Sequence, residues 1–273
     1  MKKRNLARIM NAATPAVPAT SRKKRDERGT AMSILLLFAR HSSLSSAQIS
    51  GLLRLPTTIV YRHLQTLLQA GFVVESQVIG RYSAGPEVVR LADNYRQEAL
   101  AQGAVARRLE RLSGDTGELA AYLVQSSNEV LCVESVESAH ILSCSYAAGR
   151  SRPLLHGASA RAILAHLPEE ETNEILANHS VGRDVEHTIR AELAEIRRRG
   201  YATSSGALAP GVWGVSAPVF GDAGSLAGVV TTMVPLERPA AESERTRLVK
   251  STCQAALDLS QLAAERNEVG AEA

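Results

Sequence analysis

Cysteines, aromatic side chains and long apolar runs are all scarce in this chain of 273 residues. Its three cysteines, Cys132, Cys144 and Cys253, are far apart, with no CxxC spacing and no cluster of histidines. That pattern argues against a disulfide framework and a structural zinc site, and it suits a reducing cytoplasm. No apolar run approaches the roughly 20 residues of a membrane-spanning helix, and the basic N-terminal stretch lacks the apolar region of a secretory signal. We therefore expect a cytoplasmic protein without a membrane partner, a metal or a cofactor.

Charge is unevenly divided along the chain, although the formal net charge is only +3. Residues 1–96 contain 15 Lys and Arg against 5 Asp and Glu, whereas residues 97–273 contain 16 against 23. A basic N-terminal third is typical of a module that binds phosphates. Residues 1–28 combine two basic clusters with an Ala/Thr/Pro spacer, which predicts a disordered tail. This tail either adds non-specific DNA affinity or is merely solvated.

Residues 45–72 have the pattern of two helices joined by a tight turn. Ser45 or Ser46 can cap the first helix, and Pro56 separates it from the second, which it can also begin. Apolar residues recur at helical spacing in both helices, and Gly71 is a natural left-handed stop. The residues expected to be buried are Ile49, Leu52 and Leu53 in the first helix and Val60, Leu64, Leu67 and Leu68 in the second.

A predicted β-hairpin follows at once, with strands at 72–76 and 81–83 on either side of Gly80. Two helices followed by such a wing are typical of a winged helix-turn-helix, whose second helix reads the DNA major groove. The alternative is an ordinary helical hairpin in a core, but the wing and two arginines on predicted solvent faces favour binding of double-stranded DNA. The predicted DNA contacts are Ser46, Thr57, Thr58, Tyr61, Arg62, Gln65 and Arg81.

Composition and periodicity divide the chain into five segments. They are the tail at 1–28, the winged helix-turn-helix at 29–86, a linker helix at 87–112, a larger domain at 113–267 and a short tail at 268–273. The larger domain mixes strand and helix patterns, which favours an α+β fold with a mostly antiparallel sheet flanked by helices. Strands are predicted at 119–124, 130–136, 141–146, 214–220 and 226–234, and helices at 158–167, 169–177, 189–199 and 242–264.

The chain resembles the IclR family of bacterial transcriptional regulators over most of its length, at residues 30–265. In the N-terminal part the resemblance rests on Leu55-Pro56, Val60-Tyr61-Arg62, Leu64-Gln65-Thr66-Leu67, Gly71-Phe72-Val73 and Tyr82. In the C-terminal part it rests on Gly149, residues 152–165, Gly200-Tyr201-Ala202, Pro210-Gly211-Val212 and residues 216–219. These motifs occur in order and at the family's spacing.

The resemblance implies a GAF-like C-terminal domain that binds a small effector, and a protein that binds a palindromic operator as a homodimer or a dimer of dimers. Ala207 stands where the family usually has an acid, and Ala160-Arg161 replaces the usual Gly-Lys pair. Together with Gly214, Ala207 indicates a more apolar pocket than is usual. Carried over position by position, the effector pocket comprises Ile141, Cys144, Arg152, Ala158, Ser159, Ser204, Val212 and Gly214.

The residues themselves favour an anionic ligand, such as an organic or aromatic acid. A helix that opens at 157–160 directs free backbone N–H groups and the positive end of its dipole into the preceding loop. Arg150 or Arg152 can supply a guanidinium, and Ser159 a hydroxyl, to a carboxylate. The alternative is that the small residues here only allow a helix to pack closely on a sheet.

Catalysis is the main competing function. His156 lies near Ser159, but no G-x-S-x-G elbow surrounds the serine and no acid completes a triad, so we expect a structural or ligand-contacting histidine. A GAF-like small-molecule reductase using Cys132 or Cys144 would need a resolving thiol close by. A sequence-indifferent DNA binder is a further alternative, which predicts no preference for a palindromic site. We therefore expect a regulator without catalytic residues.

Overall fold

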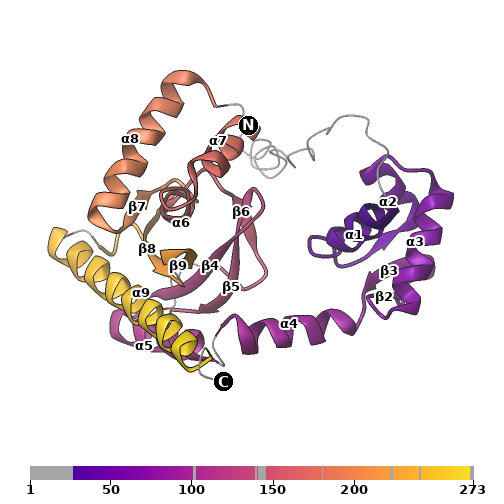
Figure 1. Cartoon of the computed structure of the whole chain (residues 1–273), viewed down its shortest axis with the longest axis horizontal. Helices are drawn as coiled ribbons and strands as arrows, with labels where there is room; N and C mark the ends of the chain where they lie inside the picture. The colour runs from indigo at the N-terminus through magenta and orange to yellow at the C-terminus, as the bar shows by residue number, and fades with distance from the viewer. Residues whose placement is uncertain are drawn as a thin grey trace, which may run out of the picture. The chain divides into compact units, whose positions relative to one another are not determined.

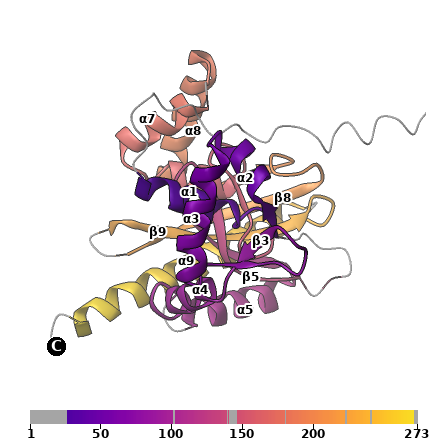
Figure 2. The ribbon, with the colours of Figure 1, turned by 90° about the vertical axis from the view of Figure 1, so that its right-hand side faces the viewer.

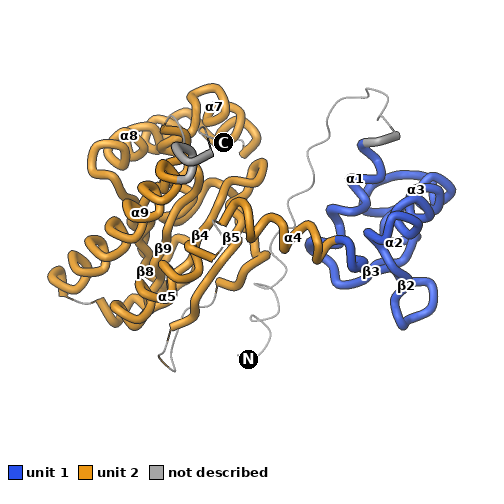
Figure 3. The backbone as a smooth tube through the Cα atoms, turned by 60° about the horizontal axis from the view of Figure 1, so that its bottom comes forward, with its two compact units in different colours: residues 1–87 blue, residues 88–273 orange. Residues whose placement is uncertain are grey.

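The computed structural model describes residues 27–100, 103–138, 140, 146–179, 181–221, 224–239 and 241–270. Two compact units divide the chain, one ending at Glu87 and the other beginning at Val88, and Figure 3 shows them in different colours. The tails expected at 1–28 and 268–273 lie mostly outside the described residues.

The N-terminal unit packs helices and a small antiparallel sheet around one core. The sheet has the strand order β1-β3-β2, and the β2–β3 pair is the predicted wing. The winged helix-turn-helix fold is therefore confirmed (Figure 1). Its elements are α1 (Glu27–Leu37), β1 (Leu44–Ser45), α2 (Ser46–Leu53), α3 (Thr57–Gln69), β2 (Val73–Glu75) and β3 (Arg81–Ala84). Its core contains Ile34, Phe38, Leu44, Ile49, Val60, Leu64, Leu67, Val73 and Tyr82.

Local side-chain chemistry fixes the ends of α2. The Ser45 hydroxyl accepts a hydrogen bond from the Gln48 N–H at 3.2 Å, and the Gln48 side chain accepts one from the Ser45 N–H at 2.9 Å. This reciprocal pair is a capping box, so Ser45 rather than Ser46 is the cap. The prediction that Leu52 is buried is wrong, because it lies on the outer side of this short helix with 49% of its surface exposed.

Glycine is required where the wing returns to the end of α3. Gly71 has φ of +74°, the left-handed conformation expected of a helix stop. A Cβ at Gly85 would lie only 2.2 Å from the Gly71 carbonyl oxygen. The Gly85 N–H also donates to the Phe72 carbonyl at 2.8 Å. These two glycines therefore allow the hairpin to close tightly against α3.

The expected single linker helix at 87–112 is wrong. Two helices occupy this stretch, α4 (Glu87–Glu98) and α5 (Ala104–Thr116). Gly103 has φ of +81° at the start of α5, and this left-handed conformation cannot continue a right-handed helix. Apolar residues recur at helical spacing on both sides of Gly103 because α4 and α5 each carry apolar residues along one face.

The C-terminal unit is built on an antiparallel sheet with the strand order β6-β5-β4-β9-β8-β7. The α+β prediction is confirmed, and the described part of the sheet contains two short edge strands, β6 and β7, that the sequence pattern did not indicate. Three or four residues are too few to show an alternating pattern. The strands are β4 (Leu119–Ser126), β5 (Glu129–Val136), β6 (Ser151–Pro153), β7 (Ala202–Ser205), β8 (Val212–Phe220) and β9 (Leu226–Pro235).

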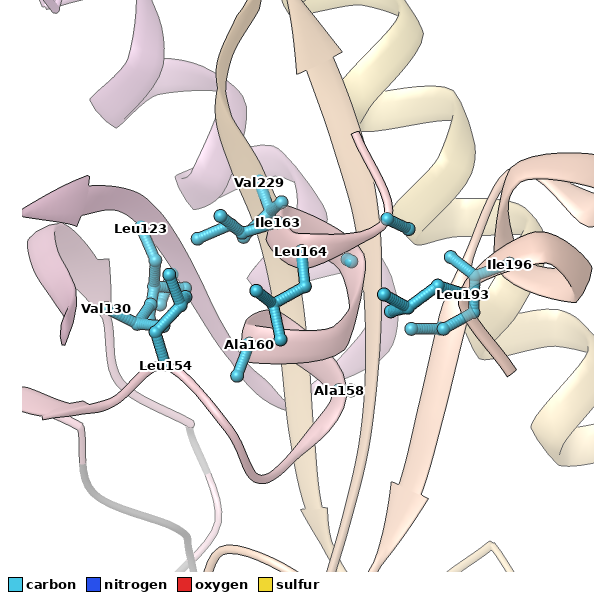
Figure 4. Close-up of a cluster of buried hydrophobic side chains, with 14 of the residues drawn as sticks. Leu123, Val130, Leu154, Ala158, Ala160, Ile163, Leu164, Leu193, Ile196 and Val229 are labelled. Atoms are coloured by element: carbon cyan, nitrogen blue, oxygen red, sulfur yellow. The ribbon is translucent and has the colours of Figure 1, made fainter. Parts of the chain in front are cut away.

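Helices cover both faces of this sheet. Figures 1 and 2 show α5 and α9 together on one face and α7 and α8 on the opposite side. Strand β4 serves both layers, since Leu123 belongs to the core with α6 and α8, whereas Tyr122 belongs to the core with α5 and α9. Figure 4 shows the first of these cores around Ile163 and Leu164 of α6. The remaining helices are α6 (Ala158–Leu164), α7 (Glu169–Asn178), α8 (Arg183–Arg199) and α9 (Glu242–Gly270).

Candidate functional site

The outward face of α3 carries the polar side chains that the sequence pattern placed there. Val60 and Leu64 are fully buried and hold the helix against the core, while Tyr61 is 47% exposed. The opposite face therefore offers hydroxyl, amide and guanidinium groups, which are the donors and acceptors that read base edges. The exposed members of the predicted set are Thr57, Thr58, Tyr61, Arg62 and Gln65.

Two of the predicted DNA contacts, Ser46 and Arg81, are more buried than the sequence pattern indicated. Ser46 is 92% buried, because Ser45 takes the capping position and Ser46 turns inward at the start of α2. Arg81 is half-buried, and its guanidinium donates to the Ser43 hydroxyl at 2.9 Å and to the Ser43 carbonyl at 2.6 Å. The prediction that Arg81 lies on a solvent face is therefore wrong, since its side chain ties β3 to the segment before α2.

A small cavity lies on the sheet face that α6 covers. It brings together five of the eight predicted effector residues, and its volume is about 10 Å³, close to the least space that holds one water molecule. Of the other four lining residues, Gly157 was expected at the helix start, whereas Leu208, Thr231 and Met233 were not predicted. The alternation of side chains along a strand places Thr231 and Met233 of β9 on one face. The lining residues are Gly157, Ala158, Ser159, Ser204, Leu208, Val212, Gly214, Thr231 and Met233.

Hydroxyl groups supply the polarity of this cavity. The Ser204 hydroxyl accepts a hydrogen bond from the Ala158 N–H at 3.0 Å, so this first amide of α6 is not free for a ligand. The Thr231 and Ser216 hydroxyls are paired at 2.8 Å in the buried sheet. Gly214 keeps the floor open, since a Cβ there would meet Ser204 and Met233 at 3.8–3.9 Å.

Arg152 is not part of the cavity. It lies exposed on the edge strand β6, where its backbone faces Val130. The local sequence could not show this, because Arg152 precedes the helix start by only a few residues although an intervening turn carries it away. Ile141 and Cys144 lie outside the described residues. Every described residue that lines the cavity is uncharged.

The thiols have the properties of buried structural side chains. Burial raises the pKa of Cys132 to about 12, and its Sγ lies 3.4 Å from the carbonyl oxygens of Glu134 and Tyr146. Burial also raises the pKa of Cys253. A thiol of this kind is the opposite of the thiolate that a cysteine-dependent reductase needs. Within the described residues, no group of three or more His, Cys, Asp and Glu side chains is arranged to hold a metal.

Comparison with known families now decides the class of protein. The model of the IclR C-terminal domain of bacterial transcriptional regulators matches residues 98–261, and the IclR helix-turn-helix domain matches residues 30–76. The chain belongs to the IclR family. It is a transcriptional regulator with a helix-turn-helix domain and a C-terminal effector-binding domain. Its homologues are transcriptional regulators rather than enzymes.

Relatives of this IclR-family chain align over most of its length. The transcriptional repressor IclR of Escherichia coli is 23% identical over 234 residues, which are 83% of this chain and 85% of the relative. The transcriptional repressor AllR of Salmonella typhimurium is 28% identical over 222 residues, 78% of this chain and 80% of the relative. The structure of an IclR transcriptional regulator from Alicyclobacillus acidocaldarius shares the fold, with a TM-score of 0.74, 24% identity and coverage of 87% of this chain and 98% of that one. No helix in the described segments is long and apolar enough to cross a membrane.

Proposed function

We propose that this regulator binds a palindromic operator in the cytoplasm as a homodimer or a dimer of dimers, and that a small organic acid bound in the C-terminal cavity changes that binding. The observation that carries the operator proposal is the division of α3 into a buried apolar face and an exposed polar one. The exposed face carries Thr57, Thr58, Tyr61, Arg62 and Gln65.

Exposed apolar pairs on two helices support association of two copies. On α4, Leu91 and Tyr95 lie one turn apart and are 57% and 42% exposed; on α1, Met32 and Leu36 are 57% and 62% exposed. Contiguous exposed apolar side chains on a helix are suited to packing against another helix. A twofold dimer pairs the same surface of both copies, and it thereby places two recognition helices on the two halves of a palindrome.

The oligomer is tested by light scattering and by binding to duplexes with one or two half-sites. The double variant Leu91→Glu/Tyr95→Glu should give smaller particles and lose the preference for two half-sites. Val89→Glu is the matched control, because Val89 is also exposed, at 68%, but lies on another side of α4. A wild-type protein that binds random duplex as well as a selected palindrome at raised salt would contradict specific operator recognition.

The effector proposal rests on hydroxyl groups rather than on a guanidinium or on the first amide of α6, which already donates to Ser204. Ser159, Ser204 and Thr231 line the cavity, and a carboxylate can accept hydrogen bonds from such donors. A ligand larger than water requires the cavity to widen, which the unbranched Met233 and the half-buried Leu208 allow by changing rotamer.

A thermal-shift screen tests this class of ligand, with each organic acid compared with its uncharged amide. A ligand at 100 times its dissociation constant stabilises the protein by about 2.7 kcal/mol. Ser204→Ala should reduce the shift, whereas Arg152→Ala should leave it unchanged because Arg152 lies outside the cavity. Equal shifts with acids and amides would contradict an anionic effector.

A further inference from the structure

We propose that the tip of the β2–β3 hairpin, formed by Val78 and Ile79, is an uncharged wedge that enters the DNA minor groove and partly unstacks a base step there. This inference rests on the proposed operator binding and adds a second, apolar contact to the polar one made by α3. Its occupant is duplex DNA.

Val78 and Ile79 are unusual residues for the turn that they occupy at the tip. Ile79 is 99% exposed and Val78 is 59% exposed. They occupy a tight turn in which the Arg81 N–H donates to the Val78 carbonyl at 3.1 Å and Gly80 has φ of +75°. Such turns favour Pro, Asn, Asp, Ser and Gly, and two adjacent β-branched apolar side chains gain nothing there in the free protein. Residues that break a local rule without a compensating contact are expected at functional sites.

The hairpin has little means of binding phosphates. Between residues 72 and 84 the charged residues are Glu75 and Arg81. Glu75 is exposed and repels phosphate, and the Arg81 guanidinium donates to Ser43 at 2.9 and 2.6 Å instead of reaching the tip. A wing with this composition contributes to DNA affinity through apolar contact, and side chains such as Ile are known to enter between base steps from the minor groove.

Continuity with the recognition helix identifies DNA as the occupant. The hairpin begins directly after α3, and Val73 at its base is fully buried in the same core as Leu64 and Leu67 of α3. The Ser76 N–H donates to the Arg81 carbonyl at 2.8 Å, which closes the hairpin just below the tip. A helix held in the major groove therefore carries a braced apolar tip on the same rigid module.

The test uses the full-length protein and a duplex selected by the wild-type protein from a random pool. The variants are Ile79→Ser, Ile79→Lys and, as a control on the polar contact, Arg62→Ala. Affinity is measured over a range of salt concentrations, and unstacking is followed with a fluorescent adenine analogue placed at successive steps of the duplex. Light scattering without DNA checks whether the tip instead contacts a second copy.

We expect Ile79→Ser to lower affinity about tenfold, since an apolar side chain of this size loses its burial. The dependence of affinity on salt should stay the same and the fluorescence signal should vanish, because an apolar contact releases no counterion. Ile79→Lys should restore part of the affinity with a steeper salt dependence. Unchanged affinity and fluorescence with Ile79→Ser would overturn the wedge, as would a change in oligomer size without DNA. Failure of the wild-type protein to select any duplex would instead overturn the proposed operator binding.

Discussion

A buried ion pair in the C-terminal unit should respond unequally to the loss of its two partners. Glu118 lies between α5 and β4, and its side chain is 5% exposed, whereas that of Arg238, after β9, is 30% exposed. The Arg238 guanidinium lies 2.5 and 2.6 Å from the two carboxylate oxygens. Arg238→Leu leaves a buried carboxylate with weaker partners, namely His140 at 4.0 Å and Arg247, which interacts with it electrostatically. Breaking a pair in this way costs about 3 kcal/mol. Glu118→Leu should cost only about 1 kcal/mol, because the guanidinium can turn into water.

Calorimetry of the full chain measures this difference as a shift of the transition of the C-terminal unit. For a unit of this size, 1 kcal/mol corresponds to roughly 2–4 °C, so Arg238→Leu should lower the melting temperature by roughly 9 °C and Glu118→Leu by roughly 3 °C. The double variant should resemble Glu118→Leu, since it contains no unpaired buried charge. Equal losses in the two single variants would refute the reasoning, because they would show that the carboxylate is solvated once Arg238 is removed.

The other predictions concern both units. Arg62→Ala should weaken binding to a selected duplex by roughly 1–3 kcal/mol in a shift titration, with an unchanged melting curve, and unaltered affinity would remove Arg62 from the interface. Leu64→Asp should abolish the calorimetric transition of the N-terminal unit while sparing that of the C-terminal unit, because it places a charge at a fully buried position; a variant that still binds DNA would contradict the assigned faces of α3. Met233→Ala should destabilise the C-terminal unit by about 2 kcal/mol in denaturant titrations but admit larger ligands in the thermal-shift screen, and smaller shifts with every ligand would count against a flexible cavity wall. Burial holds the pKa of His166 below its usual value. Below a pH of about 6.5 unfolding therefore takes up a proton, so the free energy of unfolding declines as the pH falls. His166→Gln should reduce that decline in urea titrations at several pH values.

Local patterns predicted the DNA-binding module well because its elements are specified by neighbouring residues. The apolar spacing of α3, Pro56 before it and Gly71 after it each act within a few residues, and all three agree with the structure. Ser46 and Arg81 were misplaced for a different reason. The direction of each side chain depends on a partner chosen among close alternatives, namely the capping role of Ser45 and the hydrogen bonds that Ser43 accepts. Sequence spacing does not decide between such alternatives.

The residues of the candidate effector site were predicted only in part. Ala158 and Ser159 could be placed because a helix start is a local feature, and Ser204 and Gly214 came from the family resemblance. All four line the same small cavity. The prediction that Arg152 lines the cavity failed because its position depends on the pairing of β6 with β5, a contact over more than 20 residues of chain. Thr231 and Met233 were missed because β9 is almost continuously apolar or small, so its two faces cannot be distinguished until β4 and β8 are paired beside it.

Helix α4 connects the helix-turn-helix domain to the effector-binding domain along the chain. Its 12 residues include none that is buried, and an isolated helix of that length is marginally stable in water. The apolar side chains of Leu91 and Tyr95 would therefore stabilise the helix most when a second copy covers them. In the proposed dimer, association of two copies and the stabilisation of α4 would then be one event, which makes this helix a natural point for the proposed effector to act. An effector that altered the packing of this helix by only a few kcal/mol would shift the population competent to bind two half-sites.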